Sequence, residues 1–222
     1  MVVINIKVIS DAVCPFCYVG KKRLERAIDL YRRSVPGGAD DRFNISWLPF
    51  YLDPGSSKVG IPSLERMAQK FGADRSRAII AHIRGVGATE GIDFTYAGKA
   101  GNTRDAHRLV QLAKQKETDG STDLENAVIT HLFRSYFEDG GDITSHDDLV
   151  AAAELSGLDG PEVRAWLSSG KGGVEVDAKV DDAYARGVSG VPHFIINDNI
   201  EIGGAQDVQV FVEKLMKARR EA

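Results

Sequence analysis

Cys14 and Cys17 are the only cysteines of this 222-residue chain, and two residues, Pro15 and Phe16, separate them. An apolar run over residues 2–9 precedes the pair. An amphipathic helical pattern follows it, with its apolar side at Leu24, Ala27, Ile28 and Tyr31. A Cys-x-x-Cys pair at a strand-to-helix junction is typical of a redox-active dithiol.

A helix start can activate the first of the two thiols. The first backbone N–H groups of a helix lack an intrahelical partner, and the helix dipole adds partial positive charge there, so thiols at such positions ionise more easily than free cysteine. We therefore expect Cys14 to be exposed and to act as the nucleophile, and Cys17, one turn further in, to be the resolving thiol. Pro15 suits the first helical position, where its missing N–H costs nothing.

A structural zinc site and a pair of inert thiols are the alternatives. Structural zinc takes four ligands, whereas the chain has two cysteines and no two of its five histidines have the short spacing of a zinc motif. We therefore expect no metal site, and inert thiols remain the open alternative.

Composition favours a globular protein acting on other proteins or small molecules. With 43% hydrophobic residues the chain can bury a sizeable core, and a net charge of −4 disfavours nucleic acid and anionic membranes as partners. Asn5 and Lys7 interrupt the first apolar run, so no export signal is recognisable and the cytoplasm is the expected location. Cytosolic thiols are kept reduced, which favours a cycling disulfide over a structural one.

The chain begins with a strand-helix-strand pattern, whose second strand covers residues 43–51 after a loop at 36–41. Residues 62–187 show helical periodicity without a convincing strand, which predicts an inserted all-α module. Strands are expected again at 191–196 and 200–202, joined by a turn at 198–199, and a last helix begins near residue 206.

Helix starts inside the insertion are predicted from capping patterns. Thr122 with Glu125 forms a capping box, and Asn102 and Thr144 begin close variants of it. The expected buried stripes are Ala106, Leu109, Val110 and Ala113 in one helix, and Val176, Val180, Ala183 and Tyr184 in another.

With the Cys-x-x-Cys after the first strand, the helical insertion, and Gly190-Val191-Pro192 opening a late strand, the chain resembles the thioredoxin superfamily and is similar to the DsbA family. Segments 11–20, 102–107, 187–192 and 203–206 resemble its FrnE-like branch, which is related to kappa-class glutathione transferases and 2-hydroxychromene-2-carboxylate isomerases. The resemblance implies an α/β thioredoxin fold, β-α-β plus β-β-α, with a large all-α insertion. It places a discontinuous thioredoxin domain at 1–58 and 188–222 and the helical domain at 59–187.

The resemblance also implies a cis peptide between Val191 and Pro192 that faces Cys14. Pro192 then joins Cys14 and Cys17 as a catalytic residue, and the Val191 backbone can pair with an extended substrate segment. A trans proline at the start of a strand is the alternative. The expected substrate-binding residues are Pro15, Phe16, Val191, Asn102 and Gln206.

Asn102 and three histidines have structural interpretations from the sequence alone. Asn102 is expected to cap a helix and His107 to border its apolar stripe, although the resemblance brings Asn102 close to the dithiol. His131 falls on an apolar stripe and is expected to be a hydrogen-bonded core residue. His193 should point to the opposite face from Pro192 and be structural.

Glutathione is a candidate co-substrate, and no tightly bound cofactor is expected. In glutathione-using relatives a Ser-Asp pair at a glycine-rich helix start holds the γ-glutamyl end, whereas here Ala205-Gln206 stands there. Gln206 and the backbone N–H groups can still serve.

These features predict a cytosolic thiol-disulfide oxidoreductase or isomerase that acts on a disulfide in a protein or a small molecule and is reset by a small thiol reductant. Pro15-Phe16 resembles the dipeptide of glutaredoxins, so we expect a potential nearer to about −200 to −230 mV than to the roughly −120 mV of DsbA. A glutathione transferase or glutathione-dependent isomerase is one alternative, and a non-enzymatic binding module is the other. Relatives often dimerise, which makes a homodimer a candidate state.

Overall fold

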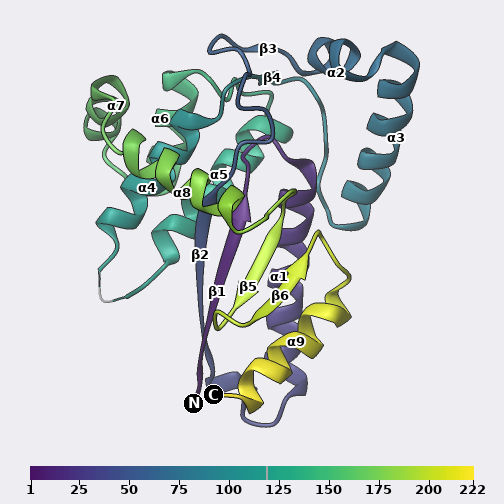
Figure 1. Ribbon diagram of the computed structural model, residues 1–222, viewed down its shortest axis with the longest axis vertical. Helices are drawn as coiled ribbons and strands as arrows, with labels where there is room; N and C mark the ends of the chain where they lie inside the picture. Colours follow the sequence, from purple (N-terminus) through teal and green to yellow (C-terminus); the bar gives the residue numbers. More distant parts are fainter. Residues whose placement is uncertain (119) are drawn as a thin grey trace.

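The computed structural model describes residues 1–118 and 120–222, and its centre is a four-stranded sheet in the order β2-β1-β5-β6 (Figure 1). β1 (Val3–Ser10) pairs in parallel with β2 (Arg42–Pro49) and antiparallel with β5 (His193–Ile196), which pairs antiparallel with β6 (Ile200–Gly203). The two ends of the chain thus build one sheet, and the predicted α/β thioredoxin fold is confirmed.

Two helices cover one face of the sheet, α1 (Pro15–Ser34) and α9 (Val208–Arg220) (Figure 1). Alternate residues of β1, Ile4, Ile6 and Val8, point to this face and are at most 1% exposed, as the period-2 pattern requires. Phe194 of β5 meets Phe211 of α9 edge-to-face, with ring centroids 4.8 Å apart. This packing fixes α1, and with it the Cys-Pro-Phe-Cys turn, relative to the strand that follows Pro192.

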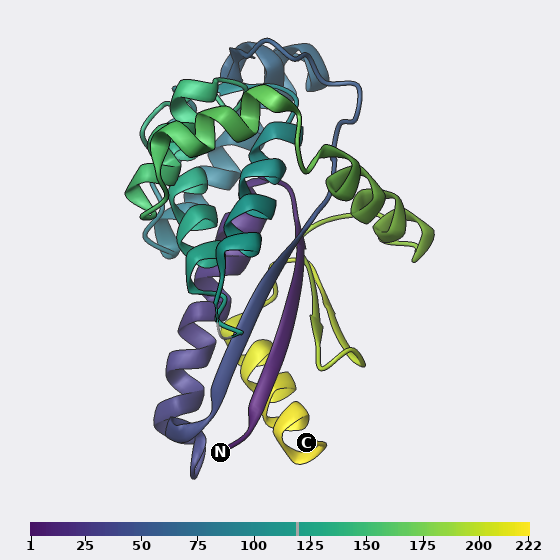
Figure 2. The same ribbon diagram turned by 90° about the vertical axis from the view of Figure 1, so that its left-hand side faces the viewer.

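The remaining helices gather around the end of the sheet where β1 stops (Figure 2). They are α2 (Ser63–Phe71), α3 (Ala73–Thr89), α4 (Arg104–Lys116), α5 (Asp123–Phe137), α6 (His146–Leu155), α7 (Gly160–Ser169) and α8 (Gly173–Ala185). A 3-10 turn, η1 (Gly38–Asp40), lies within the expected loop before β2. In the parts of the chain that the structure describes, no helix combines the length and hydropathy needed to cross a bilayer.

The expectation of an insertion without strands is wrong in one detail. β3 (Ile61–Pro62) and β4 (Lys99–Ala100) form a small antiparallel pair inside it. Two residues per strand are too few to produce a period-2 signal. The domain limits at 58/59 and 187/188 stay a prediction.

The predicted capping box at Thr122 is also wrong. Thr122 is the N-cap of α5 but makes no side-chain capping bond; its hydroxyl accepts the N–H of Ile45 at 3.1 Å. Glu125 accepts the N–H of Trp47 at 2.5 Å, and Asn126 donates to the Ile45 carbonyl at 2.8 Å. Strand β2 is an edge strand, so these side chains of α5 satisfy backbone groups that the sheet leaves unpaired.

The other predicted caps are displaced by one residue. Thr103, not Asn102, is the N-cap of α4, while the side-chain amide oxygen of Asn102 accepts the Arg104 N–H at 3.0 Å. At α6 the hydroxyl of Ser145, rather than that of Thr144, accepts the Asp148 N–H.

The buried stripes of α4 and α8 are confirmed except at one residue. Tyr184 is 39% exposed, because its hydroxyl reaches out to donate to the Tyr51 carbonyl at 2.6 Å. The hairpin turn covers residues 197–199 and includes the expected Asp198 and Asn199; Asn197 and Asp198 have positive φ.

Candidate active site

Cys14 and Cys17 lie at the first turn of α1. Cys14 is the N-cap, with extended backbone (φ −89°, ψ 113°), and Pro15 opens the helix. The Cys14 carbonyl accepts the Cys17 N–H at 3.0 Å, which closes the turn and brings both side chains to the same side. The strand-to-helix position predicted for the motif is confirmed.

The expectation that Cys14 is exposed is wrong, because its relative exposure is 4%. Its thiol donates to the backbone carbonyl of Val191, with 3.6 Å between Sγ and the oxygen. The Cys14 sulfur is therefore shielded from solvent in part by a polar backbone carbonyl that lies 177 positions away in the chain. The sulfur faces both this carbonyl and the start of helix α1.

The peptide bond between Val191 and Pro192 is cis, as the resemblance implies. The Pro192 carbonyl accepts the Gly204 N–H at 2.8 Å, and this bond ties the loop to the segment after β6. Gly20 of α1 allows the loop to approach closely: a Cβ there would lie 3.0 Å from the Pro192 ring and 3.0 Å from the Phe194 ring. The loop is thus held directly against the first turns of α1.

The Cys17 side chain is completely buried. Burial raises the pKa of the Cys17 thiol well above the usual value, and the neighbouring Cys14 side chain adds to the rise. Cys17 is therefore protonated at neutral pH while the dithiol is reduced.

Asp11, three residues before Cys14, is a site residue that sequence reasoning missed. Its carbonyl accepts the Cys14 N–H at 3.0 Å, and one carboxylate oxygen accepts the Leu52 N–H at 2.8 Å. The other lies 3.4 Å from Nε2 of His107, which also contacts the Phe50 carbonyl at 3.1 Å. Asp11 and His107 are 1% and 6% exposed, so they join α4 and the segment after β2 to the cysteine turn. The signal in the sequence was a carboxylate residue, Asp11, three positions before the first cysteine of the Cys-x-x-Cys motif.

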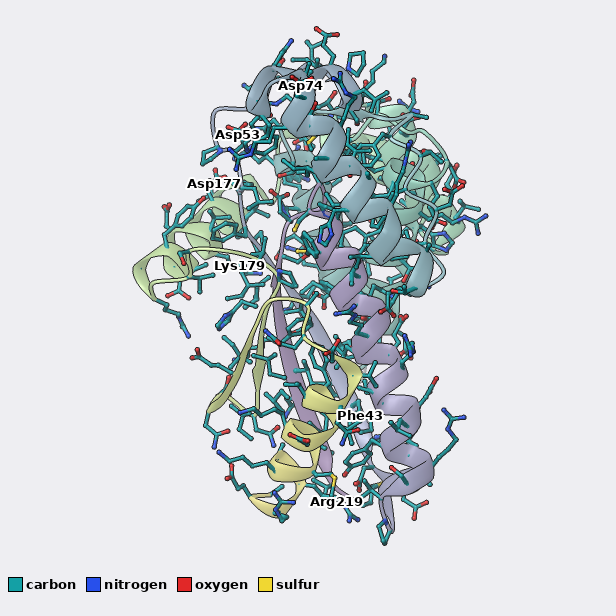
Figure 3. The ribbon with its side chains drawn as sticks, turned by 90° about the vertical axis from the view of Figure 1, so that its right-hand side faces the viewer. Phe43, Asp53, Asp74, Asp177, Lys179 and Arg219 are labelled. Carbon is teal, nitrogen blue, oxygen red and sulfur yellow. The ribbon has the colours of Figure 1, made fainter. Side chains whose placement is uncertain are left out.

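A second connection holds the same segments together near the surface. Arg104 makes a bidentate ion pair with Asp177 of α8, with 2.7 Å between Nη2 and Oδ2. Asp177 is labelled in Figure 3. Asp177 also accepts the Tyr51 hydroxyl at 2.9 Å. The start of α4 is therefore clamped to the segment after β2 and to α8.

The residues predicted to bind substrate are distributed around the dithiol. Pro15 lines a cavity beside the cysteine turn, and Phe16 is 37% exposed next to His82, with 6.5 Å between the rings. Asn102 lies between Gly101 and Thr103, which line that same cavity.

Gln206 is exposed and its amide donates to the Gly203 carbonyl at 2.8 Å. The remaining histidines stay outside the site. His131 is half-buried in α5, and His193 of β5 lies 3.3 Å from the Glu201 carboxylate on the open face of the sheet, consistent with a structural role. Among residues 1–118 and 120–222, no group of three or more histidine, cysteine or carboxylate side chains forms a potential metal site.

Comparison with known proteins agrees with the thioredoxin fold described above. The chain is 28% identical over 221 residues to the uncharacterized protein YwbO of Bacillus subtilis (strain 168), and the aligned part covers 94% of each of the two chains. The crystal structure of a probable DsbA oxidoreductase, SCO1869 of Streptomyces coelicolor, is 30% identical, covers 99% of this chain and 91% of its own, and superposes with a TM-score of 0.82.

The cytosolic disulfide reductase DsbM of Pseudomonas aeruginosa has the same fold at 15% identity, with a TM-score of 0.60 over 98% of this chain and all of its own. The family model of DSBA-like thioredoxin domains matches residues 5–216, so nearly the whole chain is included. The protein belongs to the DsbA-like family of thioredoxin-fold thiol oxidoreductases.

Proposed function

We propose that this protein is a cytosolic thiol-disulfide oxidoreductase that reduces or isomerises substrate disulfides with the Cys14–Cys17 dithiol. The observation that supports this most directly is the position of the Cys14 sulfur, at the N-cap of α1 and 3.6 Å from the carbonyl that precedes Pro192, with Cys17 buried beneath it. In this arrangement one sulfur can receive a substrate and the other can release it.

The reaction proceeds in two exchanges. The Cys14 thiolate attacks one sulfur of the substrate disulfide, the substrate S–S bond breaks, and the first substrate thiolate leaves with a mixed disulfide formed on Cys14. Cys17 then loses its proton and attacks the Cys14 sulfur, which forms the Cys14–Cys17 disulfide and releases the second substrate thiolate. A small thiol reductant supplies two electrons to restore the dithiol. Isomerisation results when a substrate thiol, instead of Cys17, attacks the mixed disulfide.

The Val191 carbonyl gives the first step its geometry. It is a backbone acceptor in the segment just before β5, and it accepts the thiol proton of Cys14. A substrate segment that pairs with the Val191 backbone would replace this bond and bring its own sulfur next to Sγ.

The decisive experiment is to trap the intermediate. Cys17→Ser removes the resolving sulfur, so the substrate should remain bound to Cys14 as a disulfide, visible in intact-protein mass spectra and lost on treatment with dithiothreitol. Cys14→Ser is the matched control and should trap nothing. A Cys17→Ser protein that carries no thiol adduct after incubation with disulfides would contradict the proposal.

The same variant separates this function from a glutathione transferase. Turnover of a disulfide should fall by at least about a hundredfold in Cys17→Ser if both sulfurs exchange, because each turnover then ends at the mixed disulfide. It should persist if Cys14 only orients bound glutathione. The segment before α9 argues against the transferase: Ala205 and Gln206 stand where glutathione-using relatives carry the Ser-Asp pair, so the hydroxyl and the negative charge that hold the γ-glutamyl end are missing at these two positions.

Location, electron donor and assembly belong to the same proposal. The cytosol fits a cycling dithiol, since stable disulfides are rare there. Glutathione or another small thiol is the proposed reductant. Membership of the FrnE-like branch and a homodimeric state are also proposals. If the protein were instead a binding module without redox chemistry, both thiols would be unreactive toward disulfides.

A further inference from the structure

A cavity of about 140 Å³ lies next to the cysteine turn, on the side of α2 and α3. Its apolar lining comes from the turn, from both helices and from α5: Val13, Pro15, Met67, Phe71, Ile83 and Phe137. An apolar cavity of about 150 Å³ holds one benzene ring. The space therefore has the size of a single ring and lies beside the residues that flank Cys14.

Helix α2 has an apolar side that the protein itself leaves incompletely covered. Ser63 is the buried residue of its nine, whereas Met67 and Phe71, which face the cavity, are half-buried. An amphipathic helix normally packs its apolar stripe against the core. Here that stripe forms one wall of the cavity, so a bound apolar group would complete its burial.

Among the described residues, Tyr96 lines the cavity and its buried hydroxyl lacks a hydrogen-bond partner. Asp11 also lines the cavity and its side chain is 99% buried, but its second carboxylate oxygen faces Nε2 of His107 at 3.4 Å. Buried polar groups are normally paired, so the Tyr96 hydroxyl indicates a ligand with a hydrogen-bond acceptor.

The charges around the cavity disfavour an anionic ligand. Asp11 contributes a carboxylate to the wall next to Cys14. Two cations of α2 also line the cavity: Arg66 forms an ion pair with Asp53, which lies beside that helix (Figure 3), and Lys70 is exposed, with its ammonium nitrogen 5.8 Å from the centroid of the Phe71 ring. An anionic group next to Cys14 would meet the Asp11 carboxylate in the wall, whereas Lys70 lies in solvent, where its attraction for an anion is screened.

We propose that this cavity selects uncharged disulfides that carry one ring-sized apolar group with a hydrogen-bond acceptor, the ring entering between α2 and the cysteine turn and the acceptor meeting the Tyr96 hydroxyl. The inference rests on the proposed function for its chemistry, since the ring half is the one that Cys14 would retain or release. Glutathione disulfide, with its several carboxylates, would bind elsewhere or weakly.

The test compares two neutral disulfides under steady-state reduction with dithiothreitol, after subtraction of the uncatalysed rate. 4,4′-Dithiodipyridine carries one pyridine ring with an acceptor nitrogen on each sulfur, and bis(2-hydroxyethyl) disulfide has no ring. Met67→Trp fills the cavity with an indole, and Leu64→Trp is its matched control, because Leu64 lies on the same helix, is 52% exposed and does not line the cavity. Tyr96→Phe removes the unpaired hydroxyl and little else.

Met67→Trp should lower kcat/KM for dithiodipyridine by at least tenfold and leave the ring-free disulfide within twofold, while Leu64→Trp changes neither. Tyr96→Phe should cost roughly three- to tenfold with the pyridine substrate only, the value of one hydrogen bond, without lowering the Tm. Equal effects of Met67→Trp on both substrates, or no effect, would overturn the inference. Binding of 4-(methylthio)pyridine to Cys14→Ser, measured by calorimetry with and without Met67→Trp, distinguishes the two proposals. Met67-dependent binding to this variant, together with a wild-type protein that reduces no disulfide, would leave the cavity standing and refute the enzyme.

Discussion

Gly20→Ala tests whether the close approach of α1 to the loop that contains Pro192 affects activity beyond its effect on helix stability. A Cβ at this position would lie 3.0 Å from Cγ of Pro192 and 3.0 Å from Cζ of Phe194, about half an ångström inside the preferred carbon separation. Alanine gains about 1 kcal/mol over glycine in a helix, and overpacking costs about 1–3 kcal/mol. The net result is a loss of roughly 0–2 kcal/mol of unfolding free energy, with the loop pushed away from α1.

The functional effect should be larger than the effect on stability. Moving Pro192 also moves the Val191 carbonyl that contacts Cys14, and displacements of this size cost roughly tenfold or more in rate when they misplace reacting groups. Urea unfolding of the reduced protein and kcat/KM with a small disulfide measure the two effects. Gly85→Ala in α3 is the control: nothing lies within 4 Å of its added Cβ, so it should gain about 1 kcal/mol and keep full activity. If Gly20→Ala behaved like Gly85→Ala, the close approach would have no functional meaning.

Three further predictions follow from ionisable groups. Burial raises the pKa of Glu125, so the stabilising contribution of the Glu125 side chain is present at low pH and is lost as pH rises through that pKa. The unfolding free energy of Glu125→Gln, measured in urea titrations, should therefore improve relative to that of the wild type between about pH 4 and pH 8. A difference that stays constant with pH would contradict this prediction. The Arg104 ion pair lowers the pKa of Asp177, so Asp177→Asn should cost up to about 1 kcal/mol at pH 7, discounted for its 44% exposure, and nothing once pH has fallen through that pKa. Burial raises the pKa of Cys17, so the mixed disulfide on Cys14 should persist longer at pH 7 than at pH 9 in rapid-quench mass spectra, unless another group rather than Cys17 limits its resolution.

Local periodicity was sufficient to predict the elements that carry the dithiol. The alternation in β1 and the apolar stripe of α1 are both visible in the sequence, and both place Cys14 at their junction. The cis peptide before Pro192 followed from resemblance, because nothing within the neighbouring residues requires it.

The errors arose where distant segments decide the structure. Cys14 is covered by Val191, and the side chains of Thr122 and Glu125 serve the edge of β2 instead of their own helix. A capping pattern reports only what a side chain can do locally, and an unpaired N–H of a strand some 77 residues away competes for it. Asp11 was missed for the same reason, since its partners lie in α4 and after β2.

These distant contacts imply that the helical insertion cannot be removed from the sheet without loss of folding. Tyr18 of α1 stacks on Phe133 of α5 at 5.1 Å between ring centroids, and Trp47 of β2 meets the same ring at 6.2 Å. Tyr18 and Trp47 are each 3% exposed, and one hydrophobic cluster runs through both parts of the chain.

Replacing residues 59–187 with a Gly-Ser linker would expose both aromatic side chains, at about 1.5–3 kcal/mol each, and would leave the Trp47 N–H of β2 without Glu125, at about 1–3 kcal/mol more. Small domains are stable by only about 5–15 kcal/mol. The truncated protein should therefore lack a cooperative urea transition and a near-ultraviolet circular dichroism signal, while the full chain has both. A cooperative transition in the truncated protein would mean that the sheet and its two helices fold as a unit of their own, and that the contacts of α5 with β2 position the site without stabilising the fold.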